Sequence, residues 1–171
     1  MITAALGKAQ FASASLTASG LTCSMCSKAV YQALSKVSFV ESVKANIQES
    51  SYQLNFKKEV PVNIDELEKA VTDAGFSVAK FAATVNFQNS AIADDTHILV
   101  SGQQFHFIHV APQTLQGAVT LTFIDKNYTT AKEYKRLSKF TAMHCYETGY
   151  MQACCKLNAA AESKRIFHVT L

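Results

Sequence analysis

Residues 20–26 read Gly20-Leu21-Thr22-Cys23-Ser24-Met25-Cys26. Just before this stretch, residues 10–17 predict a short strand in which Ala12, Ala14 and Leu16 alternate and point inward. After it, residues 26–37 carry an apolar stripe at helical spacing, which predicts a helix packed on one face. The sequence therefore places two cysteines, separated by two residues, in a loop between a strand and a helix, where both sulfurs can reach one ion.

The pattern continues beyond the first helix. Residues 43–47 and 52–56 alternate on either side of a polar turn, which predicts a hairpin. A second helix is expected from Asn63, as its N-cap with Glu66 three positions on, to Gly75 at its end, and a last strand from residue 76 to 87. This order, βαββαβ in about 75 residues, predicts a ferredoxin-like α+β domain over residues 9–88.

A Cys-x-x-Cys spacing also occurs in thioredoxin-like dithiols and in halves of zinc sites. The only prolines, Pro61 and Pro112, do not stand where a thioredoxin-like fold needs a cis-proline facing the pair. A structural zinc site needs four ligands, yet residues 1–96 contain no other cysteine and no histidine. Two thiolates without a third protein ligand suit a soft ion that accepts low coordination, Cu(I) above all. The first turn of a helix is also expected to lower the pKa of Cys26. Lys28 is either a solvated surface side chain or adds positive charge that partly balances the anionic bis-thiolate complex.

The loop of residues 20–26, the βαββαβ order and the stretch Asp73-Ala74-Gly75-Phe76 together resemble the heavy-metal-associated family over residues 9–87. The resemblance implies that Cys23 and Cys26 are metal ligands. It also implies that Leu21 anchors the loop, that Phe76 lies beside the metal, and that Met25 is exposed and is not a ligand. Thr22 before the first cysteine is similar to the copper-handling members.

The family resemblance also implies a function. It predicts capture of a soft ion, Cu(I) first and Hg, Zn or Cd as alternatives, and transfer by thiolate exchange to a partner such as a P-type ATPase domain. The alternative is a thiol-disulfide oxidoreductase that uses the same cysteines. No catalytic triad, carboxylate pair or phosphate loop is visible, so we expect a protein that is not an enzyme.

The composition of the chain argues against nucleic-acid binding and against a transmembrane helix. The 171 residues are 49% hydrophobic with a net charge of +3, which predicts a folded chain and gives too small a basic excess for nucleic-acid binding. No apolar run reaches the length of a transmembrane helix. Residues 1–8 are either a leader or the remnant of a signal segment, and on that basis a periplasmic or exported location is favoured over the cytoplasm.

The polar, acidic segment of residues 88–96 is predicted to be a linker. After it, strands are expected over residues 97–101, 104–110 and 117–124, a helix opened by the capping box Thr130 to Glu133, and a closing strand over residues 165–171. The prediction for residues 96–171 is a second, mainly β domain, a small barrel or curled sheet with one helix, whose function no motif reveals.

This second half holds His144, Cys145, Cys154 and Cys155 within a short stretch. Three interpretations stay open: a second metal site formed by these residues, a disulfide from Cys145 to one of the later pair, or buried thiols. The total of five cysteines excludes complete internal pairing.

The remaining histidines give weaker signals. His106 and His109, three apart in a predicted strand, are expected to point to opposite faces and not to chelate together. His97 and His168 have no visible partner in the sequence.

Overall fold

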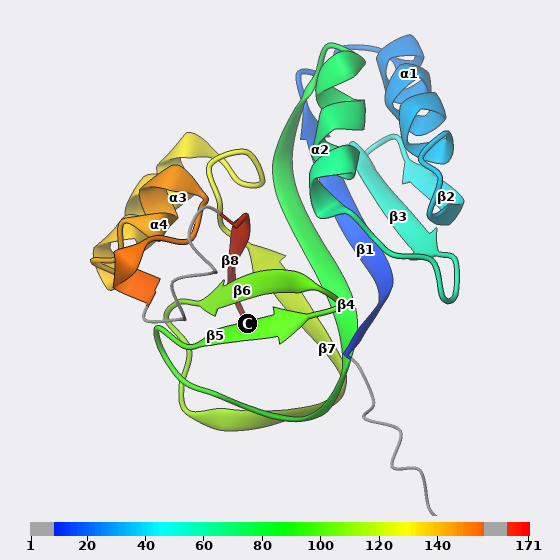
Figure 1. Cartoon of the computed structure of the whole chain (residues 1–171). Coiled ribbons are helices and arrows are strands. Elements are labelled where there is room, and N and C mark those ends of the chain that lie inside the picture. The colour runs from blue at the N-terminus through cyan, green and yellow to red at the C-terminus, as the bar shows by residue number, and fades with distance from the viewer. Residues whose placement is uncertain (1–8, 156–163) are drawn as a thin grey trace, which may run out of the picture.

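The computed structural model describes residues 9–155 and 164–171. Its first half has the predicted βαββαβ order (Figure 1). The elements are β1 (Gln10–Ser19), α1 (Ser24–Ser35), β2 (Val40–Asn46), β3 (Ser51–Phe56), α2 (Ile64–Asp73) and β4 (Ser77–Ile92). These four strands pair antiparallel in the order β2-β3-β1-β4. The ferredoxin-like arrangement expected from the sequence is therefore confirmed for this half.

Local sequence explains where the helices begin and end. Cys23 is the extended residue before α1, and the helix packs Val30 and Leu34, both fully buried, against the sheet. The side chain of Asn63 accepts a hydrogen bond from the backbone of Asp65, which caps α2 as predicted. Helix α2 ends at Asp73 with Ala74 as its C-cap, and Gly75 follows with a φ of +89°, a left-handed conformation that favours glycine.

The inward pattern predicted for the first strand is only partly correct. Ala14 and Leu16 are buried, but Ala12 is exposed. The reason is an irregularity in the β1–β4 register between Phe11 and Ser13, which shifts the side-chain alternation by one position.

The prediction of a linker over residues 88–96 is wrong, because strand β4 runs into this segment. It is 16 residues long and ends at Ile92, so most of the segment of residues 88–96 is strand. Its first part pairs with β1, and its pairing with β7 (Gln113–Phe123) runs from Phe81 to Ile92. Figure 1 shows β4 as the long strand that passes from one half of the molecule into the other. The two halves are joined by a shared strand.

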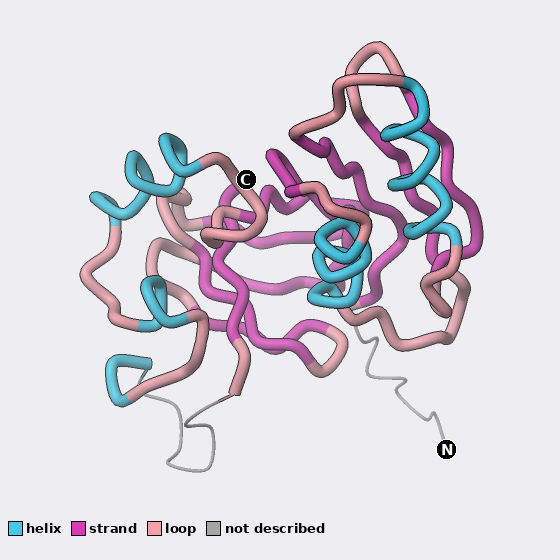
Figure 2. Tube along the Cα trace, turned by 90° about the horizontal axis from the view of Figure 1, so that it is seen from above, coloured by secondary structure: helices cyan, strands magenta, loops and turns pink. Residues whose placement is uncertain are grey.

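The prediction of a separate barrel or curled sheet with one helix in the second half is wrong. Strands β5 (His97–Val100), β6 (Gln103–Phe107), β7 and β8 (Ile166–Thr170) extend the first sheet into one open sheet of eight strands, in the order β2-β3-β1-β4-β7-β8-β6-β5. The described residues also form two α-helices, α3 (Ala131–Leu137) and α4 (Cys145–Thr148), and two 3-10 turns (Ser138–Phe140 and Ala153–Cys155). Thr130 caps α3 through the Glu133 amide, as predicted. These helices gather at the end of the molecule away from α1 (Figure 2).

One aromatic core spans both halves. Phe81 of β4 packs edge-on against Phe123 of β7, with ring centroids 4.8 Å apart. Phe11 of β1 lies 6.0 Å from Phe105 of β6, and Phe105 in turn lies 5.7 Å from Phe167 of β8. Because these rings belong to one buried cluster, burial of apolar surface couples the two halves energetically.

A polar network also ties α2 to the C-terminal strand. Arg165 donates from Nε to Asp65 Oδ2 at 3.0 Å, and Tyr128 donates its hydroxyl to Asp65 Oδ1 at 2.6 Å. The buried Asp125 carboxylate accepts from the backbone of His168 at 2.8 Å and lies 2.8 Å from His168 Nδ1.

Within the described residues, no helix is long and apolar enough to cross a membrane.

Candidate metal centre

The Cys-x-x-Cys loop lies at the surface where β1 leads into α1. Cys23 occupies the N-cap position of α1 and is exposed, and Cys26 is the third helical residue and is partly exposed. Their sulfurs lie 3.2 Å apart without a disulfide. The first turn is closed by the Cys26 amide, which donates to the Cys23 carbonyl at 3.1 Å. The predicted meeting of the two sulfurs is thus present in the structure.

Hydrogen bonds within the loop stabilise one thiolate. The pKa of Cys26 is lowered, chiefly by the hydrogen bond with the Cys23 side chain and then by one with the Thr22 backbone. The Thr22 hydroxyl also lies 3.9 Å from Cys26 Sγ. The predicted lowering is confirmed in direction. Its main cause is the neighbouring thiol and not the helix end that the sequence suggested, and Lys28 is an exposed side chain.

Apolar and polar anchors hold the loop in place. Leu21 and Phe76 are partly buried and pack against the core cluster, and Gly20, with a φ of +85°, turns the chain directly over the Phe76 ring. On the core side of the loop, the buried Tyr52 hydroxyl donates to the Ser27 carbonyl at 3.1 Å and fixes the first turn of α1. These contacts fix the backbone of the loop and leave its sulfurs at the surface.

Met25, between the two cysteines, is 76% exposed. Its side chain belongs to no buried cluster of the described residues, which agrees with the expectation that it is exposed.

The geometry suits capture of a single ion with little rearrangement. Two sulfurs that hold one ion at about 2.3 Å each stand roughly 3.8 Å apart in tetrahedral and roughly 4.6 Å apart in linear geometry. From 3.2 Å, the pair must open by about 1 Å, which rotation of surface cysteine side chains provides. Surface exposure also leaves room for a ligand from another protein.

Of the second candidate group, His144 lies apart from Cys145 and Cys155. The His144 side chain is 76% exposed and faces Glu147 at 3.7 Å, whereas Cys145 is fully buried. Cys155 is buried in the same apolar cluster as Cys145, together with Met151 and Ile166. The side chain of Cys154 lies outside the described part of the structure. His144 and Cys145 therefore point to different environments despite being adjacent.

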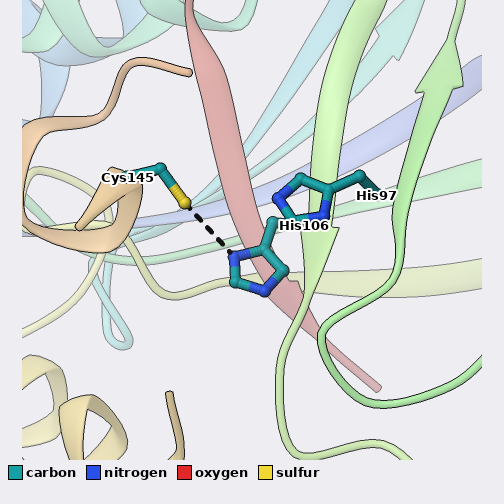
Figure 3. A group of neighbouring side chains, drawn as sticks. All are labelled: His97, His106 and Cys145. Atoms are coloured by element: carbon teal, nitrogen blue, oxygen red, sulfur yellow. Dashed lines mark hydrogen bonds between the residues drawn. The ribbon is translucent and has the colours of Figure 1, made fainter. Parts of the chain in front are cut away.

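Cys145 instead faces two histidines, His97 and His106, whose place in the sequence indicates no common site. His97 and His106 are directly opposite each other across the β5–β6 hairpin, and their rings stack 4.3 Å apart. Figure 3 shows the Cys145 sulfur directed at His106, with His97 beside it. The sequence signal for this pairing is the turn dipeptide Ser101-Gly102. In the structure both residues have positive φ, and such a two-residue turn fixes the register of the hairpin.

The other histidines lie in distinct surroundings. His109 is exposed, stacks on Phe140 and lies outside β6, so the prediction that it shares a strand with His106 is wrong, although the two side chains do lie in different surroundings. His168 lies beside His106 in the parallel β6–β8 pair and bonds to Asp125. Burial, with His168 and His97 nearby, lowers the pKa of His106 to about 4.

Comparison with known proteins gives a match to one part of the chain. Residues 15–77 match the sequence model of the heavy-metal-associated domain. No curated protein matches the chain.

Solved structures that resemble this chain include an oxidized MerP from Ralstonia metallidurans CH34, 31% identical, which covers 40% of this chain and 97% of its own, with a TM-score of 0.36. They also include a CopZ metallochaperone, 24% identical, covering 39% of this chain and 98% of its own, with a TM-score of 0.36. A third is the N-terminal domain of a potential copper-translocating P-type ATPase from Bacillus subtilis, 19% identical, covering 40% of this chain and 85% of its own, also at 0.36.

Proposed function

Residues 15–77 of this chain are a heavy-metal-associated domain, and from this premise we propose that Cys23 and Cys26 bind one soft metal ion, Cu(I) before others, and pass it to a partner protein. The observation that carries the proposal is the pair of surface sulfurs 3.2 Å apart at the start of α1. The chain acts as a carrier: it binds and releases the ion and performs no net chemistry on it.

The ligand set selects the ion. Thiolates are soft ligands that prefer Cu(I) and related ions over hard cations. Residues 9–96 supply no histidine and no further cysteine, so a closed four-ligand zinc site cannot be completed from this half. Cu(I) accepts two sulfurs, and binding releases the thiol protons to solvent. Hg, Zn and Cd are the alternatives that a metal competition would distinguish.

The exposure of Cys23 and Cys26 at the surface supports transfer of the bound ion to a partner protein. A thiolate of the partner attacks the bound ion and adds a third sulfur, after which Cys23 and Cys26 leave in turn and take up protons. The ion keeps its oxidation state, and the sulfur–metal bonds are exchanged one for one. A metal-binding domain of a P-type ATPase, with two thiolates of its own, is the partner that this chemistry suits.

The experiment is an anaerobic titration of the reduced full chain with Cu(I) in competition with a chromogenic chelator. We expect Cys23→Ser/Cys26→Ser to lose one tightly bound equivalent. The matched control Met25→Leu, between the ligands, leaves the affinity unchanged. Undiminished Cu(I) binding by the double variant contradicts the proposal.

A second function rests on the same geometry. Thiols at 3.2 Å with a lowered Cys26 pKa also favour reversible disulfide formation, as in a thiol-disulfide oxidoreductase. This alternative predicts that the metal-free chain reduces a model disulfide catalytically and that Cys23→Ser abolishes turnover. A carrier shows no turnover above that of free dithiol.

A further inference from the structure

A cluster in the second half combines ligands that are far apart in the sequence. His97 begins β5, His106 lies in β6, and Cys145 is the first residue of α4. One ligand atom from each of the three lies within 4.8 Å of the others (Figure 3). We propose that His97, His106 and Cys145 form a second metal site, which binds one soft or borderline cation independently of Cys23 and Cys26.

The hydrogen bonds of His106 leave a lone pair on the side of Cys145. Its Nε2 lies 2.8 Å from Asp95 Oδ1, and because a carboxylate accepts, this nitrogen carries the proton and donates. Nδ1 is then the unprotonated nitrogen, and it lies 3.8 Å from Cys145 Sγ. An imidazole that donates one N–H to a carboxylate and offers the other nitrogen is the usual arrangement of a metal-ligating histidine.

His97 supplies a second nitrogen without a hydrogen-bond partner. Its Nε2 is buried and makes no hydrogen bond within the described part of the chain. The ring stacks nearly parallel on that of His106, at an interplanar angle of 8°, so the His97 side chain must rotate out of the stack before both imidazoles can point a nitrogen at one ion. A buried imidazole nitrogen without a partner is costly, and a bound cation would satisfy it.

The distances fit one ion. With bonds of about 2.3 Å to sulfur and about 2.0 Å to nitrogen, a trigonal site separates sulfur and nitrogen by about 3.7 Å. The Sγ to Nδ1 distance of 3.8 Å already has this value. The remaining pairs of ligand atoms lie within 4.8 Å, against about 3.5 Å between two nitrogens of a trigonal site, so a rotation of His97 that moves its ligand nitrogen by about 1 Å closes the site.

Asp95 acts as the positioning residue. Its Oδ1 accepts from His106 and, at 3.0 Å, from the Thr141 hydroxyl, so one oxygen links β6 to the segment before α4. Its carboxylate also places a negative charge next to the site. Asp95 has a φ of +57° in the turn that leads into β5, which brings the carboxylate over His106.

Charge and softness define the class of ion. One thiolate and two neutral imidazoles suit Cu(I) or Zn(II), whereas Mg²⁺ and Ca²⁺ require oxygen ligands. With Cu(I) the ion and the Cys145 thiolate sum to zero, and with Zn(II) the Asp95 carboxylate balances the remaining charge. On binding, the Cys145 thiol releases its proton to solvent and its sulfur donates an electron pair to the ion, with no change of oxidation state.

The test uses the reduced full chain carrying Cys23→Ser/Cys26→Ser, titrated anaerobically with Co(II) as a spectroscopic probe. This background lacks the first site, so the outcome is independent of the proposed function. We expect one equivalent with a thiolate-to-cobalt charge-transfer band, displaced by Zn(II). Adding His106→Ala or Cys145→Ser should weaken binding at least about 100-fold and Asp95→Asn about 10- to 100-fold. The matched control His109→Ala, a surface histidine, should leave binding unchanged.

Two results overturn the proposal. One is the absence of a charge-transfer band in the reduced background protein. The other is a band that persists in His97→Gln and His106→Ala, which would assign the ion to cysteines alone. Because a buried substitution can impair folding, circular dichroism is recorded for each variant. Zn(II) must also raise the Tm of the background protein and leave that of the Cys145→Ser variant unchanged.

Discussion

Replacing Phe81 by Ala tests whether the two halves form one cooperative unit. Phe81 is fully buried in β4, 4.8 Å from Phe123 and 5.6 Å from Tyr128, both in the second half. Truncation of a buried phenylalanine costs about 3–5 kcal/mol, and loss of edge-on aromatic contacts adds to the desolvation cost. We expect the free energy of unfolding to fall by about 4 kcal/mol.

The assay is native-state hydrogen exchange. If the halves unfold together, the slowest amides of both must exchange about a thousandfold faster in Phe81→Ala, for example Leu54 in β3 and Val169 in β8. The matched control Phe140→Ala removes a ring that is 39% exposed and should change exchange little. Acceleration confined to one half would show that the two halves unfold separately and that β4 does not couple them.

Three further substitutions test particular contacts by urea unfolding. Asp125→Ala leaves the buried His168 without its carboxylate and should cost about 3–5 kcal/mol; a loss below about 1 kcal/mol would contradict a buried pair. Asn63→Ala removes the N-cap of α2 and should cost about 1 kcal/mol, whereas an unchanged midpoint would show that the cap is not formed in solution. Tyr52→Phe removes the hydrogen bond to the Ser27 carbonyl and should cost about 1 kcal/mol, and a stabilised variant would argue against that bond.

The first half was predictable because its signals are local. The apolar stripe behind Cys26, the cap at Asn63 and the glycine at residue 75 each act within one or two turns of chain, and the structure has a helix boundary at each. The loop that carries Cys23 and Cys26 follows from these boundaries. Ala12 was misassigned because a bulge shifts the alternation, and bulges leave no simple mark in the sequence.

The second half was harder because its arrangement depends on strand pairing. Polar residues such as Asn89, Asp94 and Asp95 predicted a linker, yet the chain continues as strand to Ile92 because β7 pairs along it. An edge-to-edge pairing of this kind is set by contacts distant in sequence, and propensity does not report it.

The cluster around Cys145 shows the same limit. The sequence of residues 143–155 suggested a site made of sequence neighbours, but the His144 side chain faces solvent in the structure. The residues that meet Cys145 come from β5 and β6, about 50 and 40 positions earlier in the chain, and only the hairpin register could have indicated that His97 lies opposite His106.

The most direct test of the central claim is the X-ray absorption spectrum of the reduced chain loaded with one equivalent of Cu(I). It is recorded on a Cys145→Ser variant, so that the second cluster does not compete for the ion. We expect a first shell of two sulfurs without imidazole scattering, and its loss when Cys23 and Cys26 are also replaced by Ser. A histidine in the first shell, or a spectrum unaffected by the Cys23 and Cys26 substitutions, would contradict binding by the Cys-x-x-Cys loop.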